Sequence, residues 1–138
     1  MDPATSLRDA TVQDIQLELI RRSSFNDFDG EQVCELLHRH RDLWRAVIFD
    51  QPGVPNYSRP GTLPTSGLIK LRDLEDNIWN VDKLFILTHT PDGARQLATV
   101  FEQETLGAMP RVYEDTDEID RALGSFGDQY GLLTAWWD

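Results

Sequence analysis

Apolar positions recur with helical spacing in four segments of the chain. Val12, Ile15 and Leu19 stand at i, i+3 and i+7, which predicts a helix over about 11–22. The same periodicity predicts helices over about 30–41, over about 90–105, and from about 115 onward. The apolar stripes expected in these three helices are Val33, Leu36, Leu37 and His40; Ala94, Leu97, Ala98 and Phe101; and Ile119, Ala122, Leu123 and Phe126.

Short apolar runs between these helices predict five strands, over about 45–50, 68–71, 83–88, 110–113 and 132–137. Residues 46–49 are apolar without interruption, so we expect the first strand to be buried on both faces. The last three strands alternate with two helices in β-α-β-α-β order, which is typical of parallel strands with right-handed crossovers. The pattern therefore predicts one α/β domain over 11–138, with a mostly parallel or mixed sheet.

Two segments fall outside this pattern. Residues 1–10 show no periodicity, and we expect a flexible N-terminus. Residues 51–67 hold four prolines and three glycines, and a loop of this length in a compact domain is usually functional or disordered. Its Tyr57 and Arg59 are residue types common in binding surfaces. The segment is therefore as consistent with an interaction site as with a mobile connector.

The net charge of the chain limits the classes of molecule that it is expected to bind. The chain has 24 acidic and 13 basic residues and a net charge of −11, which repels nucleic acid and suits a basic protein partner. No apolar run approaches the length of a membrane span, and the N-terminus lacks the apolar segment of a secretory signal. The single cysteine, Cys34, fits a reducing compartment. We expect a cytoplasmic protein that binds neither nucleic acid nor membranes.

Motifs that would identify an enzyme are missing. The sequence contains no Gly-rich phosphate loop, HExxH, CxxC or GxSxG motif, and we expect no cofactor and no metal. If the chain is an enzyme, the candidate catalytic residues are Asp50 and His89, each at the end of a predicted strand. Strand ends are where open parallel sheets bind ligands, so these two side chains would converge at one sheet edge.

Residues 88–93 suggest an anion site. Thr88, His89 and Thr90 precede a predicted helix whose free N–H groups attract anions, and Arg59 is a further candidate ligand. The residue types favour a simpler interpretation, in which Thr90 caps the helix and Pro91 occupies its first position.

Trp136 and Trp137 are adjacent in the last predicted strand, so their side chains point to opposite sides of the sheet. At a sheet edge the outward tryptophan would anchor a second subunit. In a central strand covered on both sides, both would pack in the core.

Three hypotheses of function follow. The leading one is a non-enzymatic binding or regulatory protein that acts through protein contacts, with a basic partner or a second copy of the chain. The alternative is a small enzyme or ligand-binding domain, with an anion or small-molecule pocket near Asp50, His89, Thr90 and Arg59. A structural subunit of a larger assembly is the third.

Overall fold

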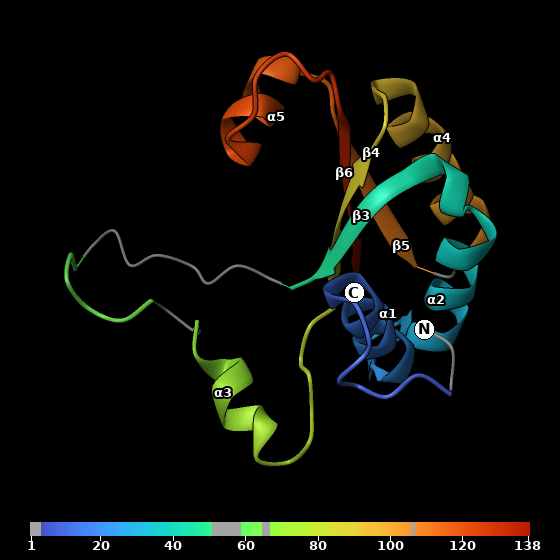
Figure 1. Ribbon diagram of the computed structural model, residues 1–138. Coiled ribbons are helices and arrows are strands. Elements are labelled where there is room, and N and C mark those ends of the chain that lie inside the picture. The colour runs from blue at the N-terminus through green and yellow to red at the C-terminus, as the bar shows by residue number, and fades with distance from the viewer. Residues whose placement is uncertain (1–3, 51–58, 65–66, 106) are drawn as a thin grey trace.

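The computed structural model describes residues 4–50, 59–64, 67–105 and 107–138 of the chain. Helices and strands alternate along these residues (Figure 1). No helix in these ranges is long and apolar enough to cross a bilayer. The elements are α1 (Val12–Arg22), β1 (Ser24–Phe25), β2 (Phe28–Asp29), α2 (Gly30–Arg39), a 3₁₀ turn η1 (Arg41–Leu43), β3 (Trp44–Phe49), α3 (Ile69–Leu74), β4 (Lys83–Thr88), α4 (Pro91–Glu104), β5 (Ala108–Tyr113), α5 (Thr116–Leu123) and β6 (Gly131–Trp137).

The main sheet has four strands in the order β3-β4-β6-β5, and every neighbouring pair is antiparallel. A second sheet is the small hairpin of β1 and β2. The mixed α/β class is therefore confirmed, but the mostly parallel or mixed sheet of about five strands is wrong. The β4-α4-β5 unit does run its two strands in the same direction. They are not neighbours, because β6 lies between them and is antiparallel to both.

The strand expected at residues 68–71 is also wrong, because this segment belongs to α3. A segment of four residues, here three apolar ones and Lys70, is too short to separate a strand from a helix by its periodicity. In Figure 1, α3 stands away from the helices that pack on the sheet. The remaining four expected strands and the four expected helices are confirmed, with ends that differ by a few residues.

One side of the main sheet packs against α1, α2 and α4, and this layer contains the hydrophobic core (Figure 1). The expected stripe of α4 is buried in full, as are Val33, Leu36 and Leu37 of α2. Trp44 and Trp137 are the largest buried side chains. The ring of Trp137 meets Phe28 and Phe101 edge-on, at centroid distances of 4.9 and 5.9 Å.

Two expected stripes are buried only in part. In α1, Val12 is 79% exposed, whereas Leu17 and Ile20 are buried. Beyond α5, Phe126 is 94% exposed, and Ile119 is the buried residue of that helix. Apolar spacing identified both helices correctly, but the side that each helix buries depends on its neighbours in space.

Local chemistry explains where the helices begin. Thr11, Asp29, Thr90 and Asp115 each accept a hydrogen bond from a backbone N–H of the first turn. At Gly30, a Cβ atom would lie 1.9 Å from the carbonyl oxygen of Ile20. Only glycine lets the start of α2 approach the end of α1 so closely.

Candidate protein-contact surface

The structure does not bring Asp50 and His89 together. In the antiparallel pair of β3 and β4, Phe49 lies opposite Leu84 and Trp44 lies opposite Thr88. Asp50 and His89 therefore follow opposite ends of this strand pair. Asp50 forms an ion pair with Lys70, and His89 is exposed. The expected convergence depended on parallel strands, which the sheet does not have.

The hydroxyl groups of Thr88 and Thr90 are used by local structure. Thr88 Oγ1 donates to the carbonyl oxygen of Thr90 at 2.7 Å, and Thr90 Oγ1 accepts from the N–H of Gly93 at 3.1 Å. These bonds agree with the helix-start interpretation. Arg59 is exposed in the connection between β3 and β4, which leaves and re-enters the sheet at the end opposite His89.

The predicted interaction residues separate into three cases. Tyr57, with most of the loop 51–67, lies outside the described residues. Trp137 is buried in the core, so it is not part of a contact surface. Trp136 points to the other side of the sheet and is 41% exposed. Their strand, β6, is central in the sheet, but the described residues cover it fully on one side only. The pair therefore matches neither an edge strand nor a central strand covered on both sides.

The uncovered side of the sheet is apolar, and we call it the open face. Cross-strand pairs place Ala46, Leu87 and Leu132 in one row and Trp136 and Met109 in another. Ile48 and Phe85 form a pair between these rows. Ile48 and Met109 are 47% and 42% exposed. The expectation that β3 is buried on both faces is therefore wrong, because its continuous apolar run supplies one residue set to the core and the other to the open face.

Helix α5 covers only one end of the open face. Figure 1 shows it on the side of the sheet opposite α2 and α4. Its Leu123 meets the sheet over an apolar hollow of about 220 Å³, lined also by Ala46, Val47, Ile48, Phe85, Leu87 and Leu132. The rest of the open face has no covering element among the residues that the structure describes.

The charges on the open face are positive. Lys83 Nζ lies 5.2 Å from the ring centroid of Phe85, and the guanidinium of Arg111 lies 4.8 Å from that of Tyr113. Neither cation forms an ion pair with a described residue. On the helical side, by contrast, Arg21, Arg39 and Arg95 are each paired with a carboxylate. We call Lys83 and Arg111 the positive rim of the open face.

Both edges of the main sheet are blocked against a further strand. At β3, the side-chain amide of Gln13 exchanges two 2.9 Å hydrogen bonds with the backbone of Val47, and Gln16 Oε1 accepts from the N–H of Phe49 at 2.9 Å. At β5, Pro110 has no N–H to offer a neighbouring strand. Among the described residues, the open face is therefore the broad part of the sheet that remains accessible.

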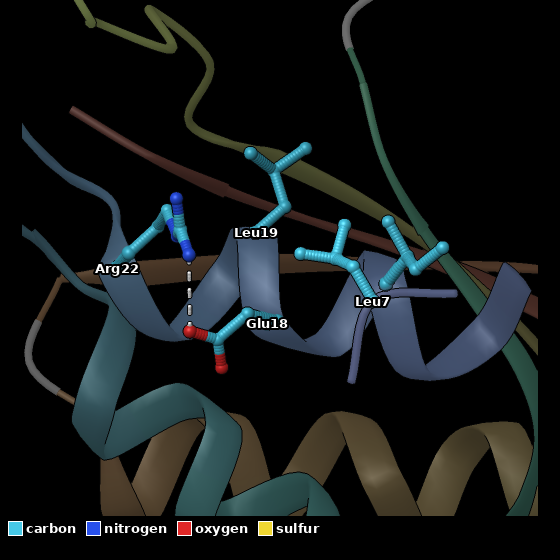
Figure 2. A pocket seen from close by; sticks show the side chains of 5 residues that line it. Leu7, Glu18, Leu19 and Arg22 are labelled. Carbon is cyan, nitrogen blue, oxygen red and sulfur yellow. Dashed lines mark hydrogen bonds and ion pairs between the residues drawn. The ribbon is translucent and has the colours of Figure 1, made fainter. Parts of the chain in front are cut away.

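The outer side of α1 bears a small hollow of about 150 Å³ (Figure 2). Figure 2 shows Leu7 and Leu19 beside the ion pair of Glu18 and Arg22, whose N–O distance is 3.3 Å. Arg21, together with Arg22, lowers the pKa of Glu18 to about 2. This hollow is smaller than a typical ligand site of roughly 300–1,000 Å³, and its charges neutralise each other.

Two larger hollows also border α1. One of about 340 Å³ between α1 and α2 is lined by Cys34, Glu35 and His38, among others. Burial raises the pKa of the Cys34 thiol, which suits packing rather than reactivity. The other, of about 450 Å³, separates the end of α1 from residues 74–79. None of the four hollows is lined by Asp50, His89 or Arg59, and no group of three potential metal ligands occurs within the described ranges.

Comparison of the chain with protein-family models, with curated proteins and with solved structures found no match. Apart from Trp136, sequence reasoning missed the residues of the open face. The sequence does hold one signal for this face. The strands β3 and β4 are apolar on both sides, and an antiparallel sheet can have one side packed on the core and the other exposed, so one apolar side of these strands can face outward.

Proposed function

We propose that the protein is a non-catalytic binding protein that contacts another polypeptide through the open face of its main sheet. The observation that carries this proposal is that one face of the sheet bears exposed apolar side chains, Ile48, Met109 and Trp136, on a chain of strong net charge. Contiguous exposed apolar surface with a polar border is typical of interaction sites.

The geometry supports contact rather than catalysis. Asp50 is paired with Lys70, and His89 follows the far end of β4. Thr88 and Thr90 use their hydroxyl groups inside the fold. Among the described residues, Asp50, His89, Thr88 and Thr90 do not gather into one site, which favours contact over the alternative of an anion or small-molecule pocket at the strand ends.

The positive charge of the rim indicates which kind of partner fits the open face. The net charge of −11 predicts a basic partner for the surface as a whole. The open face, however, carries Lys83 and Arg111 without carboxylate partners among the described residues. For this face we favour a partner that is apolar at its centre and bears carboxylates at its border.

Site-specific photo-crosslinking tests the proposal. A benzophenone amino acid is placed at Ile48 on the open face or, as the matched control, at the exposed Gln96 of α4. We expect polypeptide adducts from position 48 in the cell and few from position 96. Equal adduct yields at both positions, or none at position 48, would contradict a contact role for the open face.

A further inference from the structure

A second apolar surface lies on α3. Leu68, Leu71 and Leu74 recur at i, i+3 and i+6 from the residue that caps this helix to its last position. All three are exposed, Leu71 to 62%, and no residue of α3 is buried. We call these three residues the α3 stripe. Helices of soluble proteins usually pack such a stripe against a hydrophobic core, but the α3 stripe packs against no core among the described residues.

Two contacts hold the α3 segment at the end of the sheet. Lys70 of α3 forms an ion pair with Asp50, directly after β3, and its ammonium lies 5.4 Å from the ring centroid of Trp79. Trp79 Nε1 donates to the carbonyl oxygen of Phe49 at 3.2 Å. With these anchors in place, no described residue of the same chain covers the α3 stripe or most of the open face.

The cations of α3, Lys70 and Arg72, are paired with Asp50 and Asp73, so the charges beside the two surfaces that remain without an ion pair in the described chain are opposite in sign. Glu75 and Asp76 follow α3 directly, are exposed, and form no ion pair with any residue in the described part of the chain. Lys83 and Arg111 border the open face. A helix that lay on this face with Glu75 and Asp76 near the positive rim would pair charges that the single chain leaves apart.

We infer that the occupant of the open face is a second copy of this chain, and that the α3 stripe of each copy packs on the open face of the other around a two-fold axis. An isologous contact of this kind uses each surface twice and covers both apolar surfaces on both chains. A partner that occupied the open face alone would leave the α3 stripe in water. This inference rests on the proposed function and names its partner.

Sedimentation velocity of the purified chain tests the association. We expect the wild type to sediment as a dimer of the 15.8 kDa chain at micromolar concentrations, and the variants Leu71→Ser and Trp136→Ser to sediment as monomers with unchanged circular dichroism. Val12→Ser is the control, because Val12 is an apolar residue on α1 that is 79% exposed, more than Leu71 or Trp136. It should leave the dimer intact.

Charge reversal then tests the pairing of surfaces. The variant Lys83→Glu/Arg111→Glu carries a negative open face, and the variant Glu75→Lys/Asp76→Lys carries a positive border on α3. A dimer made of either variant alone places like charges opposite each other in both contacts. We expect its dissociation constant to rise roughly tenfold or more. An equimolar mixture restores opposite charges in both contacts of a mixed dimer, so it should recover the dimer mass.

The outcomes separate the inference from the proposal on which it rests. A monomeric wild type, with position 48 crosslinked to a different protein, overturns the second copy but leaves the open face as a contact surface. A dimer that survives Leu71→Ser and both charge variants overturns the role of α3. Recovery of the dimer in the mixture, and in neither variant alone, supports the reciprocal contact.

Discussion

The side-chain amide of Gln13 pairs with the backbone of Val47 as a neighbouring strand would, donating to its carbonyl oxygen and accepting from its N–H, both at 2.9 Å. Gln16, one turn further along α1, accepts from Phe49. Exposed strand edges are sites of unwanted pairing, and natural proteins cover them. Here a helix closes the edge of β3 with two glutamines, which leaves the open face as the accessible part of the sheet.

The first prediction concerns this closure. Gln13→Ala removes two hydrogen bonds to partly buried backbone groups, so we expect the free energy of unfolding to fall by about 1–2 kcal/mol. Urea denaturation measures it. The control is Gln96→Ala on the exposed side of α4, for which we expect a change within about 0.5 kcal/mol. Equal losses in the two variants would mean that Gln13 does not support β3.

The adjacent tryptophans are expected to behave differently. Trp137→Ala empties a fully buried site between Phe28 and Phe101 and should cost about 3–5 kcal/mol of unfolding free energy. Trp136→Ala removes a side chain that is 41% exposed, and its main effect should be on association. Denaturation of both variants at a concentration where the wild type is monomeric separates the two roles. A loss for Trp136→Ala as large as that for Trp137→Ala would contradict the one-sided burial of β6.

The turn before α4 offers a test of the helix-start interpretation. Thr90→Ala removes the acceptor for the N–H of Gly93 and should lower the unfolding free energy by about 1 kcal/mol. His89→Ala, its neighbour, is exposed and should change the stability little. Thermal unfolding of both variants is the measurement. A destabilised His89→Ala with an unaffected Thr90→Ala would reverse the assignment.

The ion pairs on α1 predict a pH dependence. Arg21 and Arg22 lower the pKa of Glu18 from its ordinary value of 4.5 to about 2. A carboxylate whose folded pKa is lowered stabilises the fold above its unfolded pKa and loses that contribution as the pH falls from about 4.5 to about 2. Wild type should therefore be more stable than Glu18→Gln at pH 7, and the difference should vanish near pH 2. A difference that is the same at both pH values would exclude this linkage.

Helices and most strands were predictable because their signals are local. Thr90 before Pro91 identifies the start of α4, and the stripe from Ala94 to Phe101 identifies its buried side. The neighbours of each strand are not local information. Nothing near β6 in the sequence says that it lies between β4 and β5, and this placement replaces the expected parallel pairing of β4 and β5 with two antiparallel pairs.

The contact surface was out of reach for the same reason. The run of Ala46 to Phe49 has the composition of a strand buried on both sides, and only the placement of the helices shows that Ile48 is left uncovered. The pairing of Asp50 with His89 failed with the parallel sheet on which it depended. Trp136 was accessible to sequence reasoning because two adjacent tryptophans in a strand must face opposite sides.

The most direct test of the contact role is the solvent exposure of the open face in the associated protein. Hydroxyl-radical footprinting reports the oxidation rates of Met109 and Trp136 on that face and of the exposed His38 on α2 as an internal control. On going from a dilute, dissociated sample to an associated one, we predict that Met109 and Trp136 become protected while His38 does not. Unchanged rates at Met109 and Trp136 in the associated sample, or protection confined to His38, would contradict the inference that a second copy of the chain occupies the open face.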